Sequence, residues 1–511
     1  MNLSLAYLEA VDIPLWSILI PLSIYLLYLY GTSPFKLWKK LGVPGPAPVP
    51  FFGNTMDLYG PDSSKAAYAK WHSHYGRVYG IYFFRHPALV VTDPELMKQI
   101  LVRDFNSFRD RMSYDGNILL NREVASGVFF AKGDVWKRIR GIVSPSFSIA
   151  KIRAMTGMVN RSAERLGEHV LNFAKDGIPW GAKLFYGAYA LDVVTGTGFS
   201  IDVDSVSNLD EPFTRHGRSL FIYKNSVKFL AFLAGSLPAV MSIINKYLKV
   251  GFFKTEDMDF FDESIKYMVK ERKEDSSKLK YNDFLQHLIS AEAETGGDDV
   301  GSKLSPEEIV AQGIMLFIAG YETASSTLQF LTYELTKHPD VLSKITAEIE
   351  EVIGTQEPTY DLCLNLKFTE AAINETLRLY PPLSVLTRQC SQPTTLNGWD
   401  LPANTAVVMP LYNIQRDPEF WKDPDTFNPD RFVEGSTSYE PYNPFTYIPF
   451  GVGPRLCVGM KLGMLEMKLS LIHILRRVSF TKATPEKLHI NDFTSILQPS
   501  MPIMIHATPR C

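Results

Sequence analysis

A single cysteine near the C-terminus lies in a setting suited to metal-ligand chemistry. Residues 450–459 read Phe450-Gly-Val-Gly-Pro-Arg-Leu-Cys457-Val-Gly459, and helical periodicity follows from Met460 to Arg477. The three glycines allow backbone angles and close approaches that a Cβ would forbid. At a helix N-terminus, free N–H groups and the helix dipole favour a thiolate over a thiol. A thiolate held against a flat apolar surface suits an axial haem ligand. The competing interpretation is a buried free cysteine in a tight turn.

A second group of reactive residues lies inside a long buried helix, predicted from Ser305 to about Lys337 by a capping box and apolar periodicity. The string Ala319-Gly-Tyr-Glu-Thr323 interrupts it. Gly320 costs roughly 1 kcal/mol relative to alanine in a helix interior, so we expect a flat ligand to approach the backbone there. Thr323 can bond back to an earlier carbonyl, and with Glu322 it could relay protons to a ligand such as O2. A kink made only for packing is the alternative.

Two further pairs have helical spacing. Trp136 and Arg140 lie four residues apart and face one way, so that both can reach one carboxylate, the arginine bidentately. Glu375 and Arg378 lie three residues apart on a helix that Pro381-Pro382 ends. An exposed pair of this kind would contribute little to stability.

Taken in chain order, these strings resemble the motifs of the cytochrome P-450 family, and the resemblance covers nearly all of residues 36–505. The chain looks most like the microsomal 3A-type subfamily, through Val43-Pro-Gly-Pro-Ala-Pro, Ser144-Pro-Ser-Phe and Phe317-Ile-Ala-Gly-Tyr-Glu-Thr. The resemblance implies a mainly α fold with a minor β-sheet region, the cytochrome P-450 fold. One catalytic domain would then occupy residues 36–511.

The resemblance also implies a role for each matching residue. Cys457 would ligate the iron of haem b. The catalytic, oxygen-activating group would be Thr323, Glu322, Ala319 and Gly320. The haem would be bound by Phe450 and by the propionate partners Arg111, Trp136, Arg140, Arg388 and Arg455. Surface arginines are the alternative for Arg111 and Arg388. Structural support would come from a buried network of Glu375, Arg378 and Arg431, although Asp430 stands where the family commonly has glutamate.

The activity implied is a monooxygenase that inserts one atom of O2 into a hydrophobic small molecule, such as a steroid, lipid or xenobiotic. Electrons would come from an NADPH-dependent flavoprotein reductase, with cytochrome b5 as a further candidate partner. One alternative is a haem-thiolate isomerase or dehydratase that acts on a peroxide without O2. Thr323 counts against it, because such an enzyme needs no proton relay to O2. The other alternative is a non-enzymatic haem-binding membrane protein.

The N-terminus predicts a membrane anchor. The run from Ile13 to Tyr30 is uncharged and mostly apolar, near the minimum length for crossing a bilayer, and lysines follow at 36, 39 and 40. The lysines should stay cytoplasmic. A cleaved signal peptide is the competing interpretation, but no basic region leads the run. We therefore expect an anchor at residues 1–35, a proline-rich hinge at 43–50, and a single-pass protein of the endoplasmic reticulum membrane whose catalytic domain is cytoplasmic.

Composition excludes several classes of protein. A formal net charge of −3 gives no general case for a nucleic-acid partner. The four cysteines, at 363, 390, 457 and 511, show no paired spacing, which argues against a disulfide framework and a zinc site.

The elements that would hold these residues are mostly helices. Two β-rich runs at 77–92 predict a hairpin, and a second hairpin is expected around residues 395–408. Residues 211–248 are unusually apolar. They form either ordinary core or a mobile lid over an apolar pocket that also contacts the bilayer.

Overall fold

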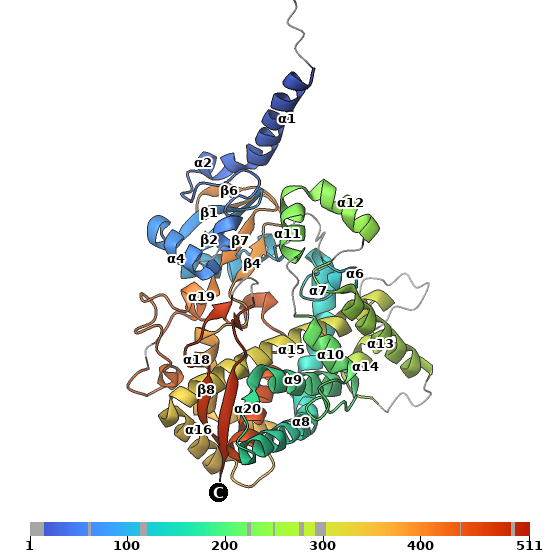
Figure 1. Cartoon of the computed structure of the whole chain (residues 1–511), viewed down its shortest axis with the longest axis vertical. Helices are drawn as coiled ribbons and strands as arrows, with labels where there is room; N and C mark the ends of the chain where they lie inside the picture. Colours follow the sequence, from blue (N-terminus) through green and yellow to red (C-terminus); the bar gives the residue numbers. More distant parts are fainter. Residues whose placement is uncertain are drawn as a thin grey trace, which may run out of the picture.

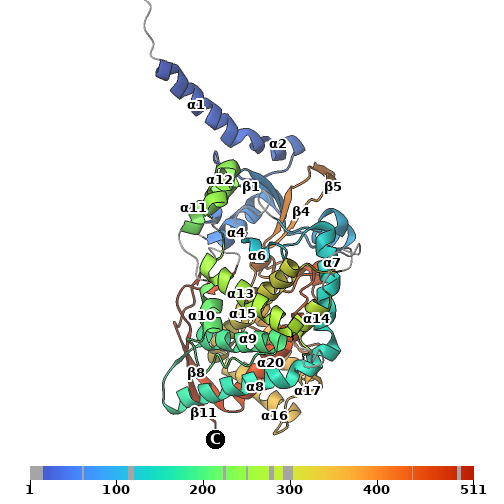
Figure 2. The ribbon, with the colours of Figure 1, turned by 90° about the vertical axis from the view of Figure 1, so that its right-hand side faces the viewer.

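A computed structural model of the chain describes residues 15–59, 63–112, 120–221, 226–248, 251–274, 281–291, 303–439, 441–491 and 496–510. Helices form most of the body, small sheets lie toward both ends, and the N-terminal helix leaves one end as a rod (Figures 1 and 2). The predicted class, mainly α with a minor β-sheet region, is confirmed.

The long helix α15 (Pro306–Lys337) crosses the middle of the body (Figure 1). Its capping box is formed as predicted: Glu308 N donates to Ser305 Oγ at 3.2 Å, and Ser305 N donates to the Glu308 carboxylate at 2.9 Å. Most of its residues are buried, and α9 (Ala182–Phe199) is its main partner. A Cβ on Gly320 would overlap the side chain of Val194 on α9. Close packing of these two helices therefore requires glycine at 320.

Other helices complete the body. The larger ones that follow the first sheet are α7 (Gly133–Val143), α8 (Ile149–Lys175), α10 (Pro212–Ser219), α11 (Ser226–Ser236), α12 (Pro238–Leu248), α13 (Thr255–Glu274), α16 (Pro339–Val352), α18 (Lys367–Leu379) and α20 (Met460–Leu475). The remaining helices are α2 (Leu37–Leu41), α3 (Thr55–Leu58), α4 (Ser63–Tyr75), α5 (Pro94–Lys98), α6 (Arg122–Ala125), α14 (Phe284–Ser290), α17 (Tyr360–Leu364) and α19 (Leu411–Ile414).

The largest sheet in the described residues has the strand order β1-β2-β7-β4. Strands β1 (Val78–Phe83) and β2 (His86–Val91) form the predicted hairpin, with Val78 opposite Val91. The second hairpin is shorter than expected, because only β5 (Thr394–Leu396) and β6 (Trp399–Leu401) pair. Strand β7 (Ala406–Met409) instead runs parallel to β2 and antiparallel to β4 (Leu386–Gln389). All four residues of β7 are buried, which suits a central strand.

The remaining strands form two small sheets, in which all strands but β3 come from the C-terminal part of the chain. One sheet has the order β3-β11-β8 and a second pairs β9 with β10. Their bounds are β3 (Trp180–Gly181), β8 (Val478–Thr484), β9 (Ile490–Asn491), β10 (Gln498–Pro499) and β11 (Met504–Pro509).

The N-terminal helix α1 (Leu15–Thr32) is exposed along its length except at Gly31. The continuous helical stretch Leu15–Leu41 is the one candidate membrane span in the described part of the chain. Residues 13 and 14 of the predicted run lie outside that part. The last turn of α1 contacts the body: the Tyr30 hydroxyl donates to Ser236 O at 3.3 Å, and the Phe51 ring packs against Gly31.

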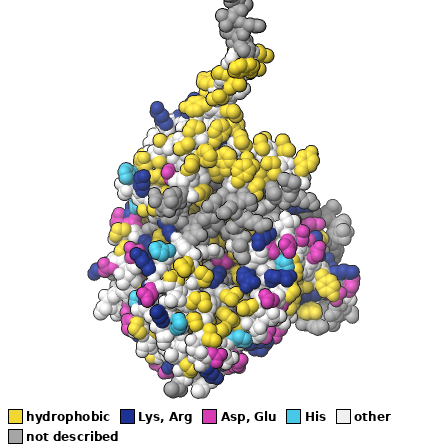
Figure 3. Space-filling view, in the orientation of Figure 1, with side chains coloured by type: hydrophobic (Ala, Val, Ile, Leu, Met, Phe, Trp, Pro, Cys, Tyr) yellow, Lys and Arg dark blue, Asp and Glu magenta, His cyan; other side chains and the backbone are white. Residues whose placement is uncertain are grey.

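Hydrophobic side chains gather on α1 and on the neighbouring end of the body (Figure 3). On α11 and α12 they include the exposed residues Phe229, Val240, Ile243 and Tyr247. The predicted apolar segment 211–248 therefore has an exposed side as well as a buried one, and its residues 222–225 lie outside the description.

Candidate active site

The cysteine loop turns sharply before α20. Cys457 N donates to Phe450 O at 2.9 Å, which closes the loop, and Cys457 precedes the first residue of α20 by three positions. Gly453 has a φ of +71°, and a Cβ there would overlap the carbonyl of Leu101. The turn therefore needs glycine. The turn leaves the Cys457 side chain exposed, whereas Cys363 and Cys390 are buried and Cys511 lies outside the described residues.

The electrostatics of Cys457 differ from the simple expectation for a helix start. The thiol is accessible but surrounded by protein, and this burial raises its pKa. The N–H groups of Gly459 and Met460 and the guanidinium groups of Arg140 and Arg111 act in the opposite direction. The predicted helix-start effect is therefore present but does not prevail. A metal cation would reverse the balance, since a coordinating thiol is deprotonated outright.

Three arginines crowd together beside the cysteine loop. Burial and mutual repulsion lower the pKa of Arg111, Arg388 and Arg455 to about 9 in each case. The Nε and Nη2 atoms of fully buried Arg388 have no hydrogen-bond partner among the residues that the structure describes. One carboxylate is close, Asp110, at 3.6 Å from Arg455.

Helix α7 contributes two more residues to the same place. The Trp136 ring lies 4.2 Å from the Arg455 guanidinium, and Arg140 donates to Leu456 O at 2.7 Å. The prediction that Trp136 and Arg140 face one way is confirmed. The structure thus brings all five of the sequence-predicted propionate partners to the cysteine loop.

This cluster fits a ligand with two carboxylates. Buried guanidinium groups without matching acids repel one another, and each planar donor fork suits a carboxylate bidentately. The unpartnered nitrogens of Arg388 are the most direct sign that an anionic ligand binds here, because a buried donor left unpaired costs free energy. A haem group has two propionates and an iron that takes a thiolate, so the donor set fits haem at this loop.

The middle of α15 has an accessible face. Ala319 and Thr323, four residues apart and on one side of the helix, are exposed within an otherwise buried element. The Thr323 hydroxyl donates to Ala319 O at 2.7 Å, which is the predicted bond to an earlier carbonyl. The helix remains continuous through this region.

Glu322 points away from that face, contrary to a direct pairing with Thr323. Its carboxylate is 1% exposed and accepts at Oε1 from Lys183 Nζ at 2.9 Å and from Gln498 Nε2 at 3.1 Å. Consecutive helical residues are rotated by about 100°, so neighbours in sequence face different partners. Gly320 likewise faces Val194, which gives it a packing role rather than the expected notch for a flat ligand.

Lys183 was missed by reasoning from the sequence. It lies in the first turn of α9, and its ammonium group also donates to Ser325 Oγ at 2.7 Å and Ser326 Oγ at 3.0 Å. Burial lowers the pKa of Lys183, while Glu322 raises it. The sequence feature that could have indicated it is that Lys183 is the one basic residue of the mostly apolar run 182–199, in which burial would require a partner for its charge.

We expect Lys183→Met to destabilise the folded protein by about 2 kcal/mol, because the buried Glu322 carboxylate loses its cation and one strong hydrogen bond. Thermal unfolding followed by circular dichroism measures the loss. Adding Glu322→Gln should recover most of it, since the uncompensated charge is removed. An equal loss in the single and double variants would show that Lys183 acts through something other than Glu322.

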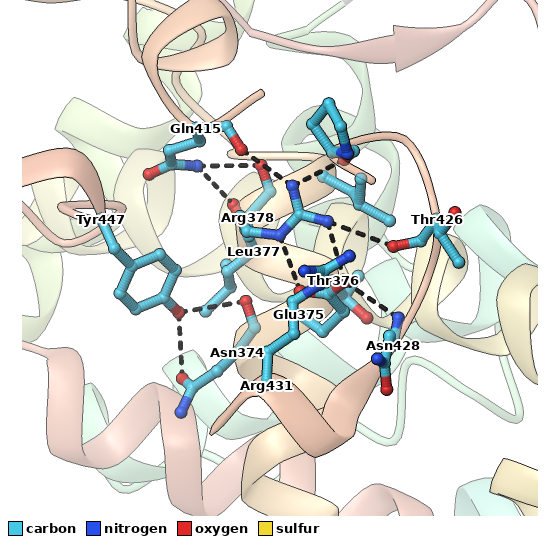
Figure 4. A network of polar contacts seen from close by, with 12 residues as sticks. Asn374, Glu375, Thr376, Leu377, Arg378, Gln415, Thr426, Asn428, Arg431 and Tyr447 are labelled. Carbon is cyan, nitrogen blue, oxygen red and sulfur yellow. Dashed lines mark hydrogen bonds and ion pairs between the residues drawn. The ribbon is translucent and has the colours of Figure 1, made fainter. Parts of the chain in front are cut away.

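A second polar network is centred on the helix α18 (Figure 4). Arg378 donates to both oxygens of Glu375, at 2.7 and 2.8 Å, and both side chains are fully buried. Arg378 also reaches the carbonyls of Gln415 and Pro424, and Arg431 lies 3.4 Å from Glu375. The three side chains that were expected to form a buried network are in contact.

Comparisons with known proteins agree with this geometry. The family model described as cytochrome P450 matches residues 43–507. Cytochrome P450 3A29 from Sus scrofa is 36% identical over 497 residues, covering 96% of each chain. Cytochrome P450 3A5 from Homo sapiens is 35% identical over 509 residues, again covering 96% of each chain. The chain therefore belongs to the cytochrome P450 family and is a haem-thiolate monooxygenase.

Proposed function

We propose that the residues gathered around Cys457 form the haem site and that the enzyme oxidises apolar small molecules. The observation that carries the proposal is an accessible thiol beside three crowded arginines, which share one nearby carboxylate, Asp110, in the described structure. Cys457 would hold the iron. The propionates would be held by Arg111, Trp136, Arg140, Arg388 and Arg455, while Phe450 anchors the loop through its carbonyl. When bound, haem supplies the redox chemistry that activates O2 and inserts one oxygen atom into the substrate.

The chain itself would supply and hold protons. The Thr323 hydroxyl donates to Ala319 O, which leaves its oxygen free to accept a second hydrogen bond at the exposed face of α15. Glu322 would act behind the helix, where Lys183 holds one carboxylate oxygen and Oε2 has no partner in the described structure. Proton supply of this kind contributes roughly 10²–10⁴-fold in typical enzymes.

The apolar side chains that we propose as pocket walls support an apolar substrate, such as a steroid, lipid or xenobiotic. Phe129 and Val385 are half-buried, and the C-terminal turn approaches the segment before β4 through a bridge between Leu383 and Ile496. These residues come from three distant parts of the chain. Apolar walls with few polar groups are typical of a pocket for a hydrophobic ligand.

The proposed electron donor is an NADPH-dependent flavoprotein reductase, with cytochrome b5 as a further candidate. Lys137 on α7 and Lys461 in the first turn of α20 are exposed on the two helices beside the cysteine loop. Exposed cations near a redox centre favour encounter with an acidic partner.

We expect Thr323→Ala to lower the product formed per NADPH consumed by roughly tenfold or more, with more hydrogen peroxide released. The assay uses the full chain reconstituted with a flavoprotein reductase and a panel of apolar substrates. Haem content and substrate affinity should survive, because alanine removes the hydroxyl with little loss of volume.

Thr327→Ala on the same helix is the control, because its hydroxyl also bonds back four residues, to Thr323 O, but is buried. Its coupling should stay at the wild-type level. A wild-type enzyme that oxidises no apolar substrate with reductase and NADPH would contradict the proposed function, and unchanged coupling in Thr323→Ala would contradict the relay role.

We also propose that residues 1–35 are a single-pass anchor in the endoplasmic reticulum membrane, with residues 36–511 as a cytoplasmic catalytic domain. The exposed length of α1 and the apolar surface of α11 and α12 at the same end support this placement (Figure 3). Lys36, Lys39 and Lys40 follow α1 on the body side. The proposed hinge at 43–50 is pinned to the sheet, because Gly80 N donates to Pro44 O at 2.8 Å.

A chain that begins at Ser33 is expected to keep its haem and its thiolate-type spectrum, with a small loss of stability from the missing Tyr30 and Gly31 contacts. Flotation with phospholipid vesicles should show weakened but persistent binding. Adding Phe229→Ser and Ile243→Ser should abolish that residual binding. Loss of haem from a folded truncated chain would contradict the boundary.

A further inference from the structure

The segment Ser126–Ala131 lies between α15 and the arginine cluster, and one buried side chain of α15 holds its backbone. Val128 N donates to Gln312 Oε1 at 2.7 Å, and Gln312 Nε2 donates to Ser126 O at 2.8 Å. Gln312 is 2% exposed. The oxygen and the nitrogen of its carboxamide therefore both bond to the segment, and together they hold its first residues as two backbone hydrogen bonds in a sheet would.

The segment is also held from the opposite side. Arg455 donates to Ala131 O at 2.9 Å, and Arg111 donates to Phe129 O at 3.2 Å. The Arg111 guanidinium lies 3.6 Å from the centre of the Phe129 ring. The position of that ring therefore depends on how the segment is held.

Gln312 on one side and Arg111 with Arg455 on the other form a clamp on the segment Ser126–Ala131. The two sides of this clamp are not equivalent. Arg111 and Arg455 are also proposed haem-propionate partners, so their donors are shared between the segment and an anionic ligand. The bonds to Gln312 are neutral and have no such competitor. Packing adds to them, because a Cβ at Gly127 would lie 2.9 Å from Met315 Cε. The α15 side is thus the constant part of the clamp.

Gln312 also lies on the same side of α15 as Ala319 and Thr323. It precedes Ala319 by seven residues and Thr323 by eleven, spacings that return to one face of a helix. The carboxamide therefore ties the Phe129 segment to the same helix face that carries the accessible threonine.

We propose that Gln312 is a positioning residue for the substrate site, which sets the place of the Phe129 ring and so selects among apolar ligands. This inference rests on the proposed function, because it takes Phe129 as a wall of the substrate pocket. A buried glutamine with a purely structural role would affect stability but would not change ligand selection.

The same helix offers a matched control. Gln329 is fully buried, and neither atom of its amide has a partner in the described part of the structure. Gln312→Met and Gln329→Met therefore make the same chemical change on one helix. Only the first removes hydrogen bonds to the Phe129 segment.

Hydrogen exchange of the full-length, haem-loaded chain gives the first test. In Gln312→Met, the Val128 amide should exchange at least tenfold faster, because it loses its acceptor. In Gln329→Met its exchange should be unchanged. Equal exchange in wild type and Gln312→Met, or equal acceleration in both variants, would overturn the clamp.

Binding of imidazole and 4-phenylimidazole gives the second test, by the shift of the haem absorption band. The two probes share a ligating nitrogen and differ by one phenyl ring. In Gln312→Met, the dissociation constant of 4-phenylimidazole should change at least fivefold and that of imidazole less than twofold. Equal changes for both probes, or none, would overturn the positioning role.

Phe129→Ala then tests whether Gln312 acts through Phe129. Gln312→Met added to Phe129→Ala should cause no further change in the ratio of the two dissociation constants, because the effects are not independent. An additive change would overturn the proposed route. Failure of imidazole to shift the wild-type spectrum would instead contradict the proposed haem site, which separates the two failures.

Discussion

Cys457→Ser is expected to abolish the thiolate-type carbon monoxide spectrum of the reduced protein and, with it, all NADPH-dependent oxidation. The thiolate gives the family its spectrum and its redox chemistry, and a serine hydroxyl has far too high a pKa to replace it. Cys457 is exposed at the end of a loop that glycines shape for it. The spectrum of the carbon monoxide complex measures the outcome directly.

The control changes the other three cysteines together to alanine and should preserve the spectrum. Burial raises the pKa of Cys363 to about 11 and that of Cys390 to about 12, which makes both poor sources of a thiolate. Cys511 is the third. If this triple variant lost the spectrum and Cys457→Ser kept it, the ligand assignment would be wrong.

Arg378→Met is expected to destabilise the protein by roughly 3–5 kcal/mol, the usual cost of breaking a buried ion pair. The change leaves the Glu375 carboxylate buried without its main cation and frees the carbonyls of Gln415 and Pro424 (Figure 4). Denaturant unfolding, followed by circular dichroism and by haem absorbance, measures the loss. We expect haem release at a lower denaturant concentration, because we propose that the network supports the chain that carries the cysteine loop.

Arg153→Met is the matched control. Arg153 and Asp361 also form an ion pair, at 2.6 Å, but both side chains are more than half exposed. Such pairs contribute about 0–1 kcal/mol. The double variant Glu375→Leu with Arg378→Met should recover part of the loss, since no unpaired charge stays buried. A cost for Arg378→Met no larger than that for Arg153→Met would refute the support role.

The arginine cluster explains why cofactor binding and stability should be linked in this protein. Burial lowers the pKa of Arg111, Arg388 and Arg455, and repulsion among the three guanidinium groups lowers it further. An anion that binds them removes the repulsion only in the folded state. Any ligand that binds the native state alone stabilises it by mass action.

Features set by local signals could be predicted from the sequence. The capping box at Ser305 fixed the start of α15, and the glycines around Cys457 predicted a sharp turn. Two β-rich runs predicted the first hairpin, β1 and β2. The apolar run from Ile13 to Tyr30 predicted a membrane anchor, and from Leu15 onward it forms an exposed apolar helix that is a candidate membrane span. In each case the determining residues lie within a turn or two of one another, so the backbone conformation follows from the local sequence. The family motifs likewise identified the residues that gather at the cysteine loop.

Other features were decided by contacts between distant parts of the chain. Glu322 turns from Thr323 toward Lys183, 139 residues away, and Gln312 bonds Val128, 184 residues away. Strand β7 leaves the expected hairpin because a central place between β2 and β4 buries it completely. The pKa of the Cys457 thiol is raised because protein surrounds it. A helix pattern tells which residues share a face, but the partner on that face depends on how whole elements pack, and only the tertiary structure contains that information.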